Sequence, residues 1–230
     1  MTELSKRARI VGFFYLLLAI VGPVRLLYVP GKLFVHGDAE ATSANILAHE
    51  TLFRLGIGAD LLGAVILVYL ALAFYRLFKD VDQYQAVVLV ITGGVLPAAL
   101  YFVNTVNDAA ALALVNGADY LAVFTEPQRH ALARFFLDLH YLLVVSAEVL
   151  WGLWLMPMAI LTLKSGFLPK FLGWWLILNG ICYLLQSFTG VFLPQYADTV
   201  SNYSFPFQFG EVAFLLWLLI FGAKQKVAAA

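Results

Sequence analysis

Long apolar stretches separated by short polar segments dominate the pattern of the chain. A helix needs about 20 mainly apolar residues to cross roughly 30 Å of hydrocarbon at 1.5 Å per residue. By this measure the sequence predicts about six membrane spans, at residues 10–29, 52–75, 86–113, 142–163, 171–193 and 209–221. We therefore expect an all-α polytopic helical bundle, formed by a single integral membrane domain over residues 1–230.

Some helical patterns extend beyond these spans, notably around the third and the fourth. Asp38 follows Gly37 and is a good N-cap, so we expect a surface helix that begins at Ala39 and runs through Thr51 into the second span without a break. The first apolar stretch is too long for a signal peptide, and no small-x-small cleavage site follows it closely. It should remain as a span.

The Lys and Arg residues in the flanks predict the orientation, because cytoplasmic loops carry an excess of them. Five basic residues fall on one side of the predicted bundle, and nine fall on the other. The nine are Lys6, Arg7, Arg9, Arg76, Lys79, Lys164, Lys170, Lys224 and Lys226. Both termini should therefore be cytoplasmic in a cell (inner) membrane, with outer loops at residues 30–50, 116–129 and 194–206.

The composition supports a membrane protein. The chain is 63% hydrophobic and 12% charged, with a mean hydropathy of +0.88, whereas soluble domains are about 45–50% apolar and 25% charged. The 14 basic and 14 acidic residues cancel, which gives no indication of a nucleic-acid partner. The lipid bilayer is the expected partner, and no oligomeric state is indicated. Cys182 is the single cysteine, which excludes an intrachain disulfide.

Polar residues interrupt all six segments at a similar level. At 1.5 Å of helix per residue, they lie about 20–28 Å from the basic flank of each span. They are Arg25, Asp60, Asn104, Glu148, Gln186 and Glu211. Further polar residues continue toward the outer surface, namely Arg54, Asn107, Asp108, Asp138 and His140. This arrangement predicts an outward-opening polar vestibule.

The fourth span shows which face is polar. Arg134, Asp138 and Glu148 fall on one stripe about 80° wide, together with Tyr141 and Val145, whereas His140 points about 120° away from Arg134. A charged residue in mid-span costs about 2.5–3.5 kcal/mol on insertion scales, so these groups must be paired or hydrated.

The acidic residues in and near the spans outnumber the basic ones by six to three. The acids are Glu50, Asp60, Asp108, Asp138, Glu148 and Glu211, and the bases are Arg25, Arg54 and Arg134. Water, cations or bound protons must balance the excess. Glu50 with Arg54 and Arg134 with Asp138 have i, i+4 spacing, which favours ordinary ion pairs at the rim. Asp60, Glu148 and Glu211 lie deeper, without a basic neighbour in the sequence.

No cofactor is predicted. His49 and His140 with nearby carboxylates would suit zinc or iron, and a haem held by two histidines is a further alternative. However, His36, His49, His130 and His140 are isolated from one another, and the sequence contains no HxxxH or HExxH motif.

Three stretches resemble the DUF4386 family, bacterial multi-pass membrane proteins of unknown function. They are LFRLGIGAD at 52–60, FLDLH at 136–140 and SGFLPKFLG at 165–173. Arg54, Asp60, Asp138 and His140 lie within these phrases, which carry no assigned chemistry. Relatives often have a histidine in a phrase like GLH, where this chain has Gly152, Leu153 and Trp154; this departure weakens the metal hypothesis.

The sequence leads to three hypotheses and does not decide whether the protein is an enzyme. The first is a vestibule that binds or passes a small polar or cationic ligand, linked to protonation of Glu148 or Asp60. Its predicted lining is Arg54, Asp60, Asn104, Asp108, Asp138, His140, Glu148 and Glu211. The second is a hydrolase of a lipid or lipid-linked substrate, with a carboxylate or His140 as general base and with or without a metal. The third is an accessory subunit without catalytic activity.

Overall fold

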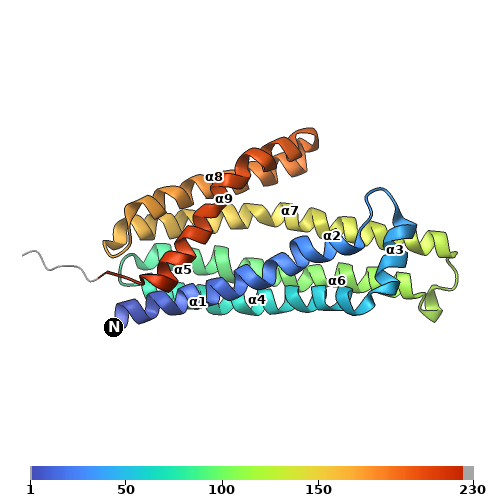
Figure 1. Cartoon of the computed structure of the whole chain (residues 1–230), viewed down its shortest axis with the longest axis horizontal. Helices are drawn as coiled ribbons and strands as arrows, with labels where there is room; N and C mark the ends of the chain where they lie inside the picture. The colour runs from blue at the N-terminus through green and yellow to red at the C-terminus, as the bar shows by residue number, and fades with distance from the viewer. Residues whose placement is uncertain (1, 225–230) are drawn as a thin grey trace, which may run out of the picture. The chain divides into compact units, whose positions relative to one another are not determined.

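A computed structural model describes residues 2–224 of the chain, and helices account for nearly all of this part (Figure 1). The α-helices are α1 (Glu3–Pro23), α2 (Val29–Leu33), α3 (Ala39–Ala48), α4 (Glu50–Phe78), α5 (Gln83–Val90), α6 (Leu96–Asn116), α7 (Glu126–Ser165), α8 (Lys170–Phe192) and α9 (Ala197–Ile220). Two π-helical turns are η1 (Val24–Tyr28) and η2 (Ile91–Val95), and two 3₁₀ turns are η3 (Asp119–Leu121) and η4 (Pro194–Tyr196).

Six helical segments are long and apolar enough to cross a membrane. They cover residues 3–33, 50–78, 83–116, 126–165, 170–192 and 194–220. The prediction of an all-α polytopic membrane protein with six spans is therefore confirmed. Helix α7 has 40 residues and is about 60 Å long, roughly twice the thickness of the hydrocarbon, so it is long enough to project beyond the bilayer.

Two predicted features are wrong. Residues 194–206 were expected to form an outer loop, but they are helical, and Pro206 lies inside α9. Proline is tolerated in membrane helices because neighbouring groups satisfy the backbone that it leaves unpaired. The surface helix was expected to run into the second span without a break, but it ends at His49, whose backbone (φ −130°, ψ 41°) is not helical. Its predicted N-cap is confirmed, because the Asp38 carboxylate accepts a hydrogen bond from the N–H of Ala41 at 2.8 Å.

The chain divides into two compact units. Unit 1 contains the described residues up to Leu18, Val65–Ala98 and those from Val145 onward. Unit 2 contains Ala19–Ala64 and Ala99–Val144.

Aromatic rings fill the core of unit 1. The fully buried ring of Phe74 contacts Tyr15, Trp154, Phe78 and Phe214, with ring centroids about 6 Å apart. Unit 2 has its own apolar core, which is built around Val29, Ile46, Phe53, Ala111 and Leu137.

Glycines let the helices of unit 1 approach closely. A Cβ atom on Gly93 would lie 2.1 Å from the ring of Trp154, and one on Gly94 would lie 2.5 Å from Cβ of Ala71. Both glycines belong to η2. The Gly-Gly pair therefore combines a local change of helix geometry with close packing.

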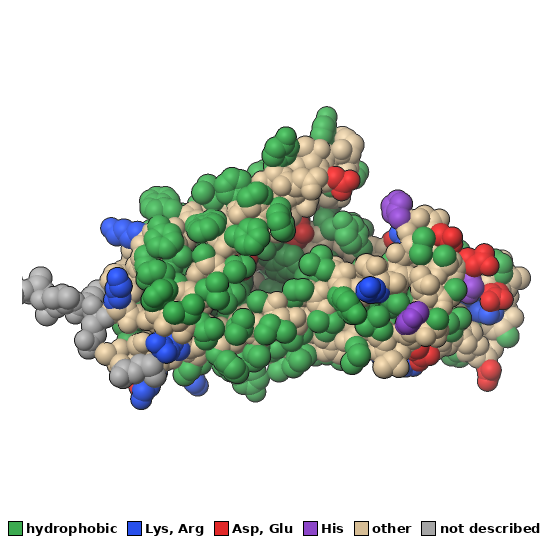
Figure 2. Space-filling model, viewed as in Figure 1, with side chains coloured by type: hydrophobic (Ala, Val, Ile, Leu, Met, Phe, Trp, Pro, Cys, Tyr) green, Lys and Arg blue, Asp and Glu red, His purple; other side chains and the backbone are tan. Residues whose placement is uncertain are grey.

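Basic side chains gather at the end of unit 1 where α1 begins (Figure 2). Arg7 donates a hydrogen bond to the carbonyl of Arg76, and Lys164 lies 2.7 Å from the carboxylate of Asp82. Lys226, which was assigned to the same side, lies outside the described residues. The clustering agrees with the distribution from which the orientation was predicted, whereas the side of the membrane stays a prediction.

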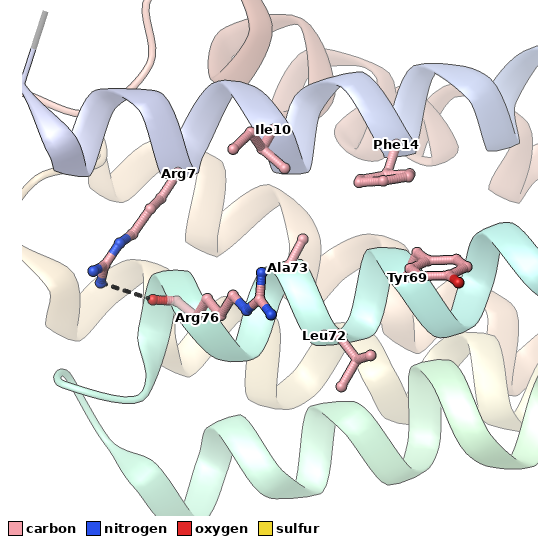
Figure 3. A pocket seen from close by; sticks show the side chains of 7 residues that line it. All are labelled: Arg7, Ile10, Phe14, Tyr69, Leu72, Ala73 and Arg76. Atoms are coloured by element: carbon pink, nitrogen blue, oxygen red, sulfur yellow. Dashed lines mark hydrogen bonds between the residues drawn. The ribbon is translucent and has the colours of Figure 1, made fainter.

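A pocket of about 230 Å³ lies between α1 and α4 of unit 1, with Arg7 and Arg76 among its lining residues (Figure 3).

Close packing at Gly12 gives a first prediction. A Cβ atom there would lie 2.7 Å from the backbone nitrogen of Leu219, which cannot move independently of its helix. We expect Gly12→Ala to lower the free energy of unfolding by roughly 1–3 kcal/mol through overpacking. Thermal unfolding in detergent measures this. Gly58→Ala on α4 is the control, since no atom lies within 4 Å of its added Cβ and alanine favours a helix. Equal losses in both variants would contradict the packing argument.

The pair of Asp82 and Lys164 predicts a pH dependence. The hydrogen bond from Lys164, with a second from the N–H of Gln85, lowers the pKa of Asp82 below its ordinary value of 3.8. A lowered folded-state pKa stabilises the protein at pH values above the unfolded pKa, and this contribution is lost as the pH falls through the folded pKa. Asp82→Asn keeps a good N-cap for α5 but removes the charge.

We therefore expect Asp82→Asn to lower the thermal midpoint at pH 7, and we expect the difference from the parent protein to shrink toward pH 3. Asp80→Asn is the control. The Asp80 carboxylate is exposed, and its contact with Arg7 is long, at 3.9 Å. A difference that stays constant with pH would count against the charge effect.

Candidate functional site

A buried arginine is the centre of the polar cluster in unit 2. Pro23 ends α1, and the π-turn η1 that follows contains Arg25, whose side chain is 4% exposed. The guanidinium lies 5.8 Å from the centroid of the Phe34 ring, a cation–π distance. On α4, a Cβ atom at Gly56 would lie 3.2 Å from Cδ of Arg25, so the glycine leaves room for the arginine stem. π-turns inside helices are frequent at functional sites.

Asp108 on α6 is the main partner of this arginine. Nη2 of Arg25 lies 2.6 Å from Oδ1 of Asp108, and Nε lies 3.3 Å from Oδ2, so the contact is bidentate. The Asp108 side chain is completely buried. Asp60 on α4 is a looser partner, with Oδ2 3.7 Å from Nε of Arg25. One carboxylate is therefore held firmly, while the other lies nearby without a direct hydrogen bond to the arginine.

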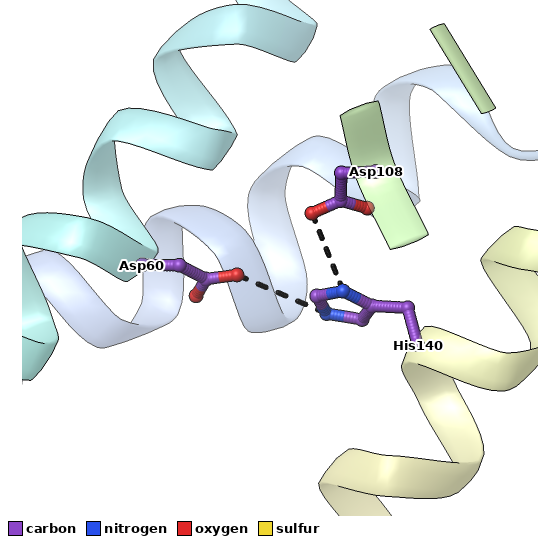
Figure 4. A group of neighbouring side chains, drawn as sticks. All are labelled: Asp60, Asp108 and His140. Atoms are coloured by element: carbon purple, nitrogen blue, oxygen red, sulfur yellow. Dashed lines mark ion pairs between the residues drawn. The ribbon is translucent and has the colours of Figure 1, made fainter. Parts of the chain in front are cut away.

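His140 on α7 lies between the two carboxylates (Figure 4). Its Nδ1 is 3.3 Å from Oδ2 of Asp108, and its Nε2 is 3.9 Å from Oδ2 of Asp60. Nδ1 is buried and makes no well-aligned hydrogen bond. The imidazole thus has an acidic group at each ring nitrogen, an arrangement that a protonated ring can serve with two N–H donors.

Asn104 fixes the backbone beside this histidine. Its side-chain amide donates to the carbonyl oxygen of His140 at 3.2 Å and accepts a hydrogen bond from Asn107 at 3.0 Å. Asn104 and Asp108 are four residues apart on α6, so one face of that helix carries both the contact to the His140 backbone and the carboxylate beside its ring.

The charges in this cluster do not balance when His140 is neutral. Asp60 and Asp108 contribute two negative charges and Arg25 contributes one positive charge, which leaves a net charge of −1. A proton on His140 would bring the sum to zero, and so would a bound monovalent cation. Because charge inside a span is costly, the cluster favours one additional positive charge.

The same side chains resemble a metal site in part. Asp60, Asp108 and His140 each offer a donor atom, and these atoms lie within 4.8 Å of one another. Carboxylate and imidazole ligands suit zinc or iron. Arg25 opposes this use, since it already contacts both oxygens of Asp108 and would lie beside the ion. The donor set therefore fits a divalent metal poorly unless Arg25 moves.

Glu211, on α9 of unit 1, lies in a different environment. It accepts hydrogen bonds from the hydroxyl of Tyr15 and, at 3.2 Å, from the amide of Asn179, and the Tyr183 hydroxyl is also directed at it. None of these partners is basic. Gln208, three residues earlier, donates to Gln186 at 3.2 Å. This acid is thus supported by neutral donors alone.

The remaining predicted site residues are not part of the Arg25 cluster. Arg54 pairs with Glu50 at 2.6 Å and Arg134 pairs with Asp138 at 2.8 Å, so both predicted i, i+4 pairs are confirmed. Glu148, in unit 1, is partly buried and makes no hydrogen bond or ion pair with any residue between 2 and 224.

Sequence reasoning included His140 and Asp138 alike in the predicted lining, but the structure separates them, since the Asp138 side chain is 58% exposed and that of His140 is 6% exposed. It left Arg25 out of the predicted lining, although the count of residues along the helix placed Arg25 at the level of Asp60. That shared level, together with Pro23, was the available signal.

Comparison with known proteins gives a family but no activity. A family model described as "Domain of unknown function (DUF4386)" matches residues 10–222. An uncharacterized protein of Archaeoglobus fulgidus is 34% identical over 112 residues, which cover 46% of this chain and 60% of that protein. No solved structure matches the chain significantly.

The buried ion pair predicts a large difference between two Asp→Asn substitutions in unit 2. Asp108→Asn leaves Arg25 buried without its bidentate partner, and breaking such a pair costs roughly 3–5 kcal/mol. Asp138→Asn removes an exposed pair worth about 0.3–0.5 kcal/mol. Chemical or thermal unfolding in detergent measures both free energies. Similar losses in the two variants would show that the contact between Arg25 and Asp108 is not the stabilising one.

Proposed function

This chain belongs to the DUF4386 family, and because that family has no assigned activity, we propose its function from the chemistry of the cluster in unit 2. The protein binds a small monovalent cation beside Asp60 and releases a proton from His140 as it does so. The proposal keeps the cationic ligand of the hypothesis drawn from the sequence, but it assigns the proton to His140 in place of Glu148 or Asp60.

The observation that supports it is the imidazole between two carboxylates, with an arginine that compensates only one of them. Arg25 holds Asp108 through contacts of 2.6 and 3.3 Å, so Asp108 is less open to another cation than Asp60 is. Asp60 has only contacts of 3.7 and 3.9 Å, and its side chain is 13% exposed, against at most 6% for its three partners. A cation therefore has its best approach and its best ligand at Asp60.

Proton release follows from charge balance. In the first state His140 is an imidazolium that faces both carboxylates, and the cluster is neutral. A cation that enters beside Asp60 repels the imidazolium and takes over its role as counter-charge. His140 then loses one proton, and its neutral Nε2 becomes an acceptor directed toward the cation. Because both states are neutral overall, exchange between them avoids net charge within the span.

The wider vestibule is part of the proposal. Arg54 with Glu50 and Arg134 with Asp138 are exposed pairs of unit 2, and we propose that they border the outward approach to Asp60. Asn104 acts by holding the backbone of His140 and does not contact the ligand. The proposed exchange does not require Glu148 or Glu211.

The metal-dependent hydrolase is a second candidate. It is favoured by the three donor atoms within 4.8 Å and opposed by the position of Arg25. An accessory role would need the cluster for packing alone. The three functions differ in whether the purified protein releases protons when a cation binds and in whether it contains a metal.

The test is proton release from detergent-solubilised protein in weakly buffered solution, followed with a pH indicator. We expect the addition of Na⁺, K⁺ or methylammonium to release about one proton per chain at saturation, as charge balance requires. Asp60→Asn should abolish the release because the cation loses its ligand. His140→Gln should abolish it because the proton is absent.

Asp119→Asn is the matched control, as it removes an exposed carboxylate of the same unit that lies outside the cluster and its proposed approach, and it should leave the release unchanged. If none of the three cations releases protons from the parent protein, the proposal fails. Elemental analysis separates the rival function, since stoichiometric zinc or iron that is lost in Asp60→Asn would favour the hydrolase.

A further inference from the structure

The pocket between α1 and α4 lies in unit 1 and shares no residue with the cation cluster. It has a basic end and an aromatic end (Figure 3). Arg7 on α1 and Arg76 on α4 form the basic end. The rings of Phe14 and Tyr69 form the other end and are stacked, with centroids 6.0 Å apart and planes 13° from parallel.

The two ends are separated by the same length of helix on both sides. Arg7 and Phe14 are seven residues apart, and so are Tyr69 and Arg76, which corresponds to about 10 Å of helix. Between them the pocket is apolar, with Ile10, Leu72 and the small side chain of Ala73. The result is a groove about two helical turns long, with cations at one end.

The two arginines differ in what they already contact. Arg7 donates to the carbonyl oxygen of Arg76 and lies near the carboxylates of Glu3 (3.7 Å) and Asp80 (3.9 Å). The guanidinium of Arg76 makes no hydrogen bond or ion pair with any residue in the described part of the chain. Nearby acids therefore offset Arg7, whereas Arg76 keeps its donors available at the mouth of an apolar groove.

We infer that this groove binds one anionic phospholipid, with the headgroup phosphate on Arg76 and Arg7 and the first part of an acyl chain over Ala73. Charge complementarity identifies the occupant, because an apolar channel that ends in two guanidinium groups matches a molecule with a phosphate on an acyl chain. The basic flank around the groove places it at the end of unit 1 where cytoplasmic contacts with anionic lipid are expected. The aromatic stack ends the channel and limits the bound length of the chain.

The test uses short-chain lipids that dissolve as monomers. The thermal midpoint of the full chain in a non-ionic detergent at low salt is followed against dihexanoylphosphatidylglycerol, dihexanoylphosphatidylcholine and sodium phosphate, since a ligand of the folded state raises the midpoint. We expect the phosphatidylglycerol to stabilise the protein at the lowest concentration. Inorganic phosphate, which lacks the chain, should have no effect.

Substitutions assign the effect to the groove. Arg76→Gln should weaken the apparent affinity for phosphatidylglycerol about fivefold, the change expected for one basic side chain. The phosphatidylcholine response should change less, because the choline cation already offsets the phosphate of that lipid. Lys79→Gln is the matched control, because Lys79 carries the same charge near the same helix end but does not line the pocket. Ala73→Leu fills the apolar part and should weaken both lipids.

Three results would each overturn the inference. They are equal stabilisation by the anionic and the zwitterionic lipid, stabilisation by phosphate alone, and an equal loss of affinity in Lys79→Gln and Arg76→Gln. The last result would mean that the lipid responds to the total charge of this end and not to the groove.

Discussion

Charge inside a membrane span is tolerated only where an opposite charge or a set of hydrogen-bond donors meets it, and the contact between Arg25 and Asp108 satisfies this condition in unit 2. Asp60 and His140, the other charged or titratable members of the cluster, are arranged around that contact. It engages both oxygens of Asp108, whereas Asp60 is the more loosely held carboxylate, and His140 lies between the two acids. The chemistry proposed for the protein follows from this unequal sharing of one arginine.

The two units stabilise buried acids in different ways. Asp108 meets a cation, whereas Glu211 meets Tyr15 and Asn179, which are neutral donors. An ion pair holds a carboxylate in its charged form and resists a second cation. Neutral donors do not favour the charged form in this way, because a hydroxyl or amide group can reorient and accept a hydrogen bond from the protonated acid. The exchange that we propose therefore concerns the cluster in unit 2, while Glu211 in unit 1 is satisfied by its neutral donors.

The spans could be predicted from the sequence because the thickness of the hydrocarbon sets a minimum helix length, and each apolar stretch can be compared with it separately. The local ion pairs were equally predictable, since Arg134 and Asp138 are neighbours on one helix. The sequence could not predict which of the lining residues come together. His140 is directed toward residues of other helices, and the pattern of one helix carries no information about their position. The break at His49 had no Gly or Pro to mark it, and Pro206 misled because it normally ends helices in water.

The π-turn η1 has a consequence for how the first span is compared with its relatives. The N–H of Val29 bonds to the carbonyl of Val24, five residues back, so this turn holds one residue more than its α-helical equivalent. The helical segments before and after it are consequently out of phase, and a single periodicity applied to residues 3–33 mixes two faces. An alignment with a relative that lacks this turn therefore has to admit a one-residue gap there, or it will pair lipid-facing positions with interior ones.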